Sequence, residues 1–154
     1  MNMARNTPAD LAARVGQEIG VSSWIAVDQS RIDEFAHCTD DHQWIHVDVE
    51  RATRESPFKA PIAHGYLTLA LLAPMSVEAL MSQVQARQVV NYGLDKVRFL
   101  APVRAGRRIR NRVKIVAVED KGQGRWLLTS ENTVEIEGED KPALIATALA
   151  MLMF

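Results

Sequence analysis

The sequence predicts an α+β domain in which an antiparallel sheet wraps one long apolar helix. A helix-length apolar segment fills residues 65–83, and four strand-like segments follow it without another helix between them. The chain has 154 residues, of which 47% are hydrophobic and 24% charged, and this balance suits a globular domain with one core. We therefore expect residues 1–154 to form a single domain.

The first third of the chain is predicted to hold short helices and irregular segments. Thr7 is typical of a residue that caps the start of a helix. A short strand at residues 24–27 precedes a second helix, for which Asp28 or Ser30 is the expected cap. Asp48 is expected to cap a third helix within VDVERATRES, and the proline-bounded loop PFKAPIAHG then leads to the apolar segment.

The apolar segment, HGYLTLALLAPMSVEALMSQ, has large side chains on nearly every side. A helix that is apolar all round is normally buried all round, so we expect a central helix over residues 65–83. Pro74 lies inside this segment, and an interior proline removes one backbone hydrogen bond. The sequence therefore predicts a bend near residues 70–73.

The second half of the chain changes to a period of two residues. The strand-like segments are VVNYGLDKVRFLAPV, RRIRNRVKIVAVED, GRWLLTSENTVEIEG and KPALIATALAMLMF, with turn signals between them. In the second of these, alternation places one set of residues on the core face: Ile109, Val113, Ile115 and Ala117. The apolar last strand would be hazardous if exposed, so pairing with a second copy of the chain is expected.

Bulk properties exclude several classes of function. The formal net charge is −1 and the pI about 6.4, so no basic field indicates a nucleic-acid partner. The continuous apolar runs fall short of the roughly 18 residues that span a bilayer, so no membrane association is expected. The single cysteine, Cys38, fits a reducing compartment, and we expect a cytoplasmic protein.

The stretch DDHQWIHVD, at residues 40–48, concentrates the polar chemistry of the chain. His42 and His46 stand four residues apart, as in helical zinc sites, but Gln43 cannot act as the general base of a zinc protease. The pair Trp44-Ile45 favours extended structure over a helix. We therefore expect no metal site.

The remaining chemistry is general acid–base catalysis by Asp41 and His46, which a loop can bring onto one water molecule. Gly65 opens the central helix, so its free backbone amide is a candidate to polarise a carbonyl oxygen. An alternative stays open at this point, because polar residues near a helix start are often purely structural.

The stretch FAHCTDDHQWIHVDVERA, together with IAHGYLTLALL and NYGLDKVRFLAPV, resembles the MaoC-like (R)-specific enoyl-CoA hydratases, in their nodulation-protein-N-like branch. The resemblance runs from about residue 30 to the C-terminus. It implies a hot-dog fold, with residues 65–83 as the helix inside an antiparallel sheet, and a homodimer. It also implies a hydro-lyase that needs no cofactor or metal and reversibly hydrates a trans-2-enoyl-CoA, or the acyl-carrier-protein thioester, to the (R)-3-hydroxyacyl thioester.

By motif position, the resemblance implies that Asp41 and His46 are the catalytic pair and that Gly65 provides the oxyanion-hole amide. Gln43 stands where the family has asparagine and is expected to orient the loop or the water. Candidates for further substrate contacts are His64, Tyr66, Asn91 and Tyr92.

One departure from the family motif is Asp40, which replaces a glycine, although aspartate tolerates a positive φ better than most residues. Two alternatives to the hydratase remain: a hot-dog acyl-CoA thioesterase, or a catalytically reduced protein that only binds acyl thioesters.

Overall fold

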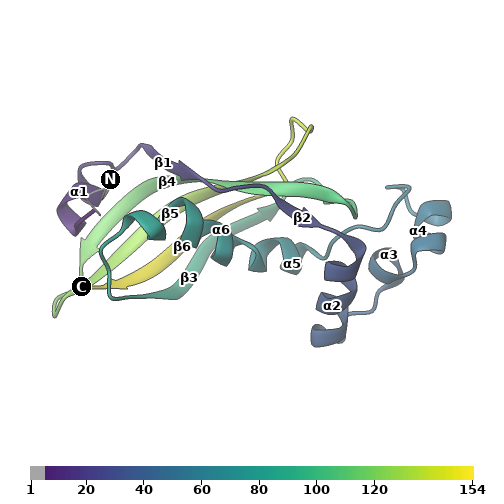
Figure 1. Ribbon diagram of the computed structural model, residues 1–154, viewed down its shortest axis with the longest axis horizontal. Helices are drawn as coiled ribbons and strands as arrows, with labels where there is room; N and C mark the ends of the chain where they lie inside the picture. Colours follow the sequence, from purple (N-terminus) through teal and green to yellow (C-terminus); the bar gives the residue numbers. More distant parts are fainter. Residues whose placement is uncertain (1–5) are drawn as a thin grey trace.

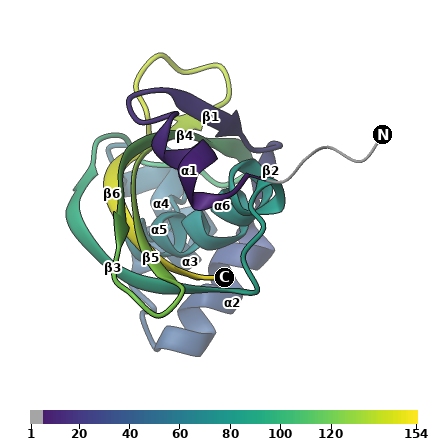
Figure 2. The same ribbon diagram turned by 90° about the vertical axis from the view of Figure 1, so that its left-hand side faces the viewer.

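The computed structural model describes residues 6–154, and one six-stranded antiparallel sheet dominates them (Figure 1). The strands stand in the order β1–β4–β5–β6–β3, and β2 also pairs with β4. Their bounds are β1 Glu18–Val21, β2 Ile25–Val27, β3 Gln88–Phe99, β4 Arg107–Asp120, β5 Arg125–Ile136 and β6 Leu144–Met153. The sheet curves around the central helices, as Figure 2 shows, so the predicted α+β architecture is confirmed.

The central segment is not one rod but two helices and a short turn. These are α5 Gly65–Ala70, α6 Leu72–Ala79 and the 3-10 turn η1 Met81–Gln83. The break falls at Leu71, inside the predicted range for the bend. A proline ring clashes with the carbonyl four residues earlier, which for Pro74 belongs to Ala70, the last residue of α5.

The prediction that the central helix is buried all round is wrong. Leu72, Met75 and Ala79 are at most 6% exposed, whereas Tyr66 is 71% exposed and Val77 57%. The curved sheet covers only one side of the helix, so the opposite side keeps its apolar residues at the surface. On this helix, the side on which a residue lies decides its burial more than its hydrophobicity does.

By length and composition, Gly65–Gln83 is apolar enough to cross a membrane. This was not predicted, because its uninterrupted apolar runs are each too short to span a bilayer. The segment is broken at Leu71, and its inner residues form part of the apolar core against the sheet. The inner side of this segment is therefore the part of the central helix that packs against the sheet.

Strand β4 shows the predicted alternation, with one departure. Ile109, Val113 and Ile115 are fully buried, and Arg108 and Lys114 are exposed. The alternation shifts between Ile115 and Ala117, where the pairing with β5 is irregular, and Ala117 is only half-buried.

Two polar residues share the core face of the sheet. Asn111 on β4 and Asn132 on β5 are both fully buried. They lie between two apolar clusters, one containing Ile109 and Val134, the other containing Val113 and Leu128. Asn111 was not among the residues predicted for this face of β4.

Helices α2 Gln29–Thr39, α3 Trp44–Val47 and α4 Val49–Glu55 extend beyond one end of the sheet, at the right of Figure 1. The predicted caps are confirmed: Asp28 Oδ1 accepts from the Arg31 amide at 2.9 Å, and Asp48 Oδ1 from the Arg51 amide at 2.9 Å. The first helix, α1 Pro8–Ala12, has Thr7 as its cap.

Two local predictions fail in this region. Strand β1 was not predicted, because it is short and contains Gly20, which lets the backbone approach Ala79 closely. Trp44-Ile45 was expected to be extended but lies in α3. Tertiary contacts decide the conformation there: the Ile45 carbonyl accepts from the Ile62 amide at 3.1 Å, and long-range contacts of this kind override weak local propensity.

The burial of the helix predicts a contrast between two residues on α6. Met75→Ala should lower the free energy of unfolding by about 2–5 kcal/mol, because it leaves a cavity in the core. Val77→Ala, on the exposed side of the same helix, should change it by less than about 0.5 kcal/mol. Urea denaturation followed by circular dichroism measures both, and equal losses would contradict the one-sided packing.

Candidate active site

Asp41 is positioned by the abrupt end of α2. Asp40, the residue directly after α2, has φ 60° and ψ 15°, which is the left-handed conformation that often follows a helix. Asp40 itself is exposed. The left-handed residue ends α2 and turns the chain, so Asp41 enters the loop that precedes α3. The family glycine is thus replaced by one of the few residues that adopt this conformation at modest cost.

His46 lies on α3 and is only 6% exposed. Its Nδ1 lies 2.6 Å from the Ile62 carbonyl oxygen, and because a carbonyl only accepts, Nδ1 must carry the proton. In the neutral ring the other nitrogen, Nε2, then keeps its lone pair. The backbone before the central helix therefore selects the tautomer of His46.

Burial lowers the pKa of His46 below its ordinary value of 6.5. The hydrogen bond to Ile62 and the charge of Asp41 act in the opposite direction, while the neighbouring His64 adds to the lowering. Burial has the largest effect, so the ring is neutral at physiological pH. A neutral imidazole with a free Nε2 is able to accept a proton.

His64 connects the two candidate catalytic residues. Its ring stacks on that of His46, with centroids 3.9 Å apart and planes inclined by 26°. Its Nε2 lies 2.9 Å from the backbone carbonyl of Asp41, so this nitrogen donates and Nδ1 carries the lone pair. The ring of Phe35 packs near His64, at 5.0 Å between centroids. His64 is 2% exposed, so it holds the site together from inside.

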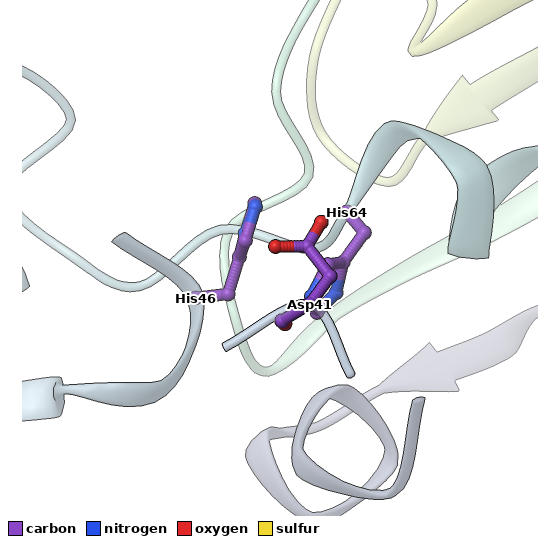
Figure 3. Close-up of side chains that lie close together, drawn as sticks. All are labelled: Asp41, His46 and His64. Atoms are coloured by element: carbon purple, nitrogen blue, oxygen red, sulfur yellow. The ribbon is translucent and has the colours of Figure 1, made fainter. Parts of the chain in front are cut away.

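The three side chains converge, and Figure 3 shows the Asp41 carboxylate beside the two imidazole rings. One ligand-type atom from each of Asp41, His46 and His64 lies within 4.8 Å of the others. Such a cluster has the composition of a metal site. However, the stacked rings hold their lone pairs in two nearly parallel planes, whereas the lone pairs of ligands to a single ion must meet at one point. The arrangement suits one water molecule better.

Gly65 begins α5 directly after His64. Its amide has no acceptor in the hydrogen bonds of residues 6–154, as expected at the first position of a helix. A Cβ at this position would lie 3.2 Å from three atoms of the Phe99 ring, so the aromatic ring closely covers the glycine. Gly65 provides both the small size and the free amide at this point.

A cavity of about 310 Å³ adjoins this glycine. Ile62, whose carbonyl holds His46, also lines it, so the cavity and the Asp41–His46 pair lie against the same stretch of backbone. Most of the lining is apolar: Ile62, Ala63, Phe99, Leu100, Ala101, Pro102, Val103 and Ala143, with Gly65 and Thr68. A thioester near Gly65 would therefore be held in apolar surroundings.

The other predicted site residues lie at several different places. Gln43 is exposed, and its backbone amide is 3.4 Å from Asp41 Oδ1. Tyr66 is exposed and packs its ring against Phe99 edge to face, with centroids 6.3 Å apart. Asn91 and Tyr92 lie on β3 and line a second cavity farther along the central helix. His42, the residue of the discarded zinc motif, is exposed.

Sequence reasoning missed three residues that shape the site. Ile62 orients His46 through a backbone carbonyl, and Phe99 covers Gly65 from β3. Gln29 donates from Nε2 to the His46 carbonyl at 2.8 Å. Contacts between positions far apart in the chain leave no local pattern, so nothing in the sequence pointed to them.

The chain is similar to a known protein family and to named relatives. The sequence model of the MaoC like domain matches residues 10–136. Nodulation protein N of Rhizobium leguminosarum bv. viciae is 47% identical over 146 residues, which cover 95% of this chain and 91% of that protein. The 3-hydroxyacyl-thioester dehydratase Z of Mycobacterium tuberculosis is 47% identical over 141 residues, covering 92% of each chain.

Solved structures share the fold. A monoamine oxidase regulatory protein from Archaeoglobus superposes with a TM-score of 0.82 at 27% identity, over 98% of this chain and 97% of that one. The (R)-hydratase of A. caviae superposes with a TM-score of 0.69 at 20% identity, over 89% and 98% of the two chains. The central helix inside an antiparallel sheet is thus the hot-dog fold.

The burial of His46 predicts how stability depends on pH. Because the folded-state pKa is lowered, protonation favours the unfolded chain, and stability falls as the pH drops from about 6.5 through the folded-state value. Urea unfolding at a series of pH values should show this loss, and His46→Gln should reduce it. An NMR titration of His46 with a pKa above 6.5 would contradict the burial effect.

Proposed function

The chain belongs to the MaoC-like family, and on that premise we propose that it reversibly hydrates trans-2-enoyl thioesters to (R)-3-hydroxyacyl thioesters. The relatives include a protein named as a 3-hydroxyacyl-thioester dehydratase, which supports an enzyme of the hydratase and dehydratase type. The observation that carries the proposal is the convergence of Asp41 and His46 beside the free Gly65 amide. That combination provides a place for water and a place for a developing oxyanion.

In this proposal a water molecule is held between the Asp41 carboxylate and His46 Nε2. The neutral imidazole accepts one proton as the water oxygen adds to C3 of the enoyl group. The electrons of the C2–C3 double bond move toward C2 and the thioester carbonyl. A proton is then returned to C2 from the Asp41–His46 pair, so that the elements of one water molecule are added.

Negative charge on the thioester oxygen has to be stabilised between these two proton transfers. The Gly65 amide is the donor available for it, since it lacks a partner within residues 6–154. Removing one such donor from an oxyanion hole in other enzymes costs about 2.7–4 kcal/mol of transition-state stabilisation.

His64 acts in this scheme as a positioning residue. It bonds to the Asp41 backbone and stacks on His46, so it fixes the distance between the two proton-transferring groups without touching the substrate. Pre-organisation of this kind lowers the barrier because the groups need not reorder during the reaction.

The substrate carrier is proposed to be coenzyme A, with an acyl-carrier-protein thioester as the other candidate of the same chemistry. We place the activity in the cytoplasm, since a single free cysteine fits a reducing compartment. No metal or organic cofactor takes part in the proposed steps.

Substitution of the pair tests the proposal. Asp41→Asn and His46→Gln should each lower kcat for crotonyl-CoA hydration by about 10²–10⁴-fold, because each removes a proton-transferring group. The loss of absorbance of the conjugated thioester measures the rate, which should be unchanged in EDTA. His42→Asn is the matched control, since His42 is exposed on the same loop.

Rates in Asp41→Asn equal to those of the unmodified protein would refute the assignment. Release of free thiol from saturated acyl-CoA at a rate above that of hydration would favour the thioesterase instead. Tight binding of enoyl-CoA without turnover would favour a protein that only binds acyl thioesters.

We further propose that the protein is a homodimer paired through β3. This strand lies at the edge of the sheet, and its outer edge has no partner strand within residues 6–154. It also exposes large apolar side chains, namely Val89, Val90, Tyr92, Leu94 and Phe99. Long apolar edge strands rarely stay unpaired in soluble proteins. Two structural neighbours are described as complexes of paired chains, ChsH1-ChsH2 and HadBC.

The dimer is tested by placing a charge on this edge. Val90→Lys should shift the protein toward the monomer in sedimentation velocity, since a lysine on an edge strand opposes pairing. Val116→Lys is the control. Val116 is similarly exposed, at 43% against 41% for Val90, but it lies on β4, which has a neighbouring strand on each side. A monomeric unmodified protein at micromolar concentration would overturn the proposed dimer.

A further inference from the structure

A second cavity, of about 370 Å³, lies between the central helix and the sheet beyond the first. Helices α5 and α6, the segment after them, β3 and β6 provide most of the lining: Leu69, Ala70, Leu72, Ala73, Ser76, Leu80, Met81, Asn91, Tyr92, Gly93, Leu94, Ala148, Leu149 and Ala150. Strand β5 contributes Ser130. The lining is mainly apolar. Its polar side chains are Asn91 and Tyr92 on the exposed strand β3, and Ser76 and Ser130 on the side of the core.

This cavity follows the first one along a single face of the central helices. Gly65 and Thr68 line the first cavity, and Leu72 and Ser76 line the second, at spacings of three to four residues that share one helix face. Strand β3 contributes to both, through Phe99 in the first and through residues 91–94 in the second. Ala143, directly before β6, lines the first cavity, and β6 itself lines the second. The face of the helix that begins at Gly65 therefore leads toward the second cavity.

The length of the path indicates which part of an acyl chain would arrive there. Gly65 and Ser76 are eleven residues apart, which corresponds to about 16 Å along a helix at a rise of 1.5 Å per residue. The break at Leu71 shortens this distance somewhat. The second cavity is thus within reach of the distal end of a medium-length acyl chain.

The serine residues belong to a buried polar cluster beneath the helix. Asn111 Nδ2 donates to Asn132 Oδ1 at 2.9 Å and to Ser76 Oγ at 3.3 Å. Asn132 Nδ2 donates in turn to Ser130 Oγ at 3.0 Å. Ser130, Asn111 and Asn132 are at most 7% exposed. Two strands, β4 and β5, and helix α6 thus bring four polar side chains together beside the apolar core.

The cluster keeps unused hydrogen-bonding capacity. Asn111 Oδ1 is buried and has no partner among residues 6–154. Ser130 accepts from Asn132, but within the same residues its hydroxyl proton is not donated to any acceptor. Ser76 and Ser130 line the cavity, whereas Asn111 and Asn132 do not. Ser76 Oγ donates to Asn132 Oδ1 and accepts from Asn111, which leaves it one lone pair. The free proton of Ser130 and this lone pair of Ser76 are the capacity that a ligand in the cavity can use.

We propose that the second cavity binds the distal part of an acyl chain that carries a hydroxyl group, and that Ser76 and Ser130 recognise this group. A hydroxyl both donates and accepts, which matches the free capacity of the cluster. An unsubstituted alkyl end would leave the hydroxyl proton of Ser130 without an acceptor. The inference rests on the proposed hydration of enoyl thioesters and narrows its substrate class to hydroxylated chains.

A comparison of two substrates tests this preference. The unmodified protein is given trans-2-dodecenoyl-CoA and the same compound with a hydroxyl group at successive positions near the distal end. We expect kcat/KM for the best hydroxylated chain to exceed that of the plain chain by about three- to tenfold, the effect of one or two neutral hydrogen bonds. Ser76→Ala and Ser130→Ala should each reduce this ratio toward unity.

Ser82→Ala provides the matched control, because Ser82 is an exposed serine just beyond α6 and does not line the cavity. Its ratio of kcat/KM for the hydroxylated chain to kcat/KM for the plain chain should equal that of the unmodified protein.

Equal kcat/KM values for plain and hydroxylated chains would overturn the inference while leaving hydration established. Absence of hydration with both would instead contradict the proposed function. Calorimetry of both compounds with Asp41→Asn then decides whether the cavity still prefers the hydroxylated chain, and equal affinities would overturn the preference.

Discussion

The hydrogen bond from His46 Nδ1 to the Ile62 carbonyl is the contact on which the candidate site depends. It joins a helix outside the sheet to the backbone that leads into the central helix. By engaging Nδ1, it selects the tautomer with a free Nε2. It raises the pKa of His46, but the burial of the ring has the larger effect and lowers the pKa below its ordinary value. His64, two residues after Ile62, stacks on the same ring and holds the Asp41 backbone. One short stretch of chain thus positions the acid–base pair and presents the Gly65 amide beside it.

Local patterns in the sequence predicted much of the framework. Asp28 and Asp48 were recognised as caps because a carboxylate before a helix satisfies a free amide within a few residues. The bend before Pro74 followed from the missing amide and the clash of the ring. Strand β4 followed from its alternation. In each case the cause lies within one turn of helix or one strand.

The features that the sequence did not predict depend on contacts between distant segments. The helical conformation of Trp44-Ile45 requires the backbone of Ile62, and the role of Phe99 requires β3 to pass over Gly65. The outer side of α6 was expected to be buried, but a sheet that curves around a helix covers only one side of it. Asn111 was not predicted to be buried. On the core face of β4 it lies between Ile109 and Val113, and no local pattern indicates that Asn132 and Ser76 will hydrogen-bond to it.

Asp40 illustrates how a departure from a family motif changes a loop without removing its shape. A glycine at this position would enter the left-handed conformation freely, but it would enter many others as readily. Aspartate reaches φ 60° with a modest strain, but it leaves the unfolded chain fewer conformations than glycine would. The backbone entropy that this turn loses on folding is then smaller. The strain at one residue is thus offset by a smaller entropic cost of placing Asp41 after α2.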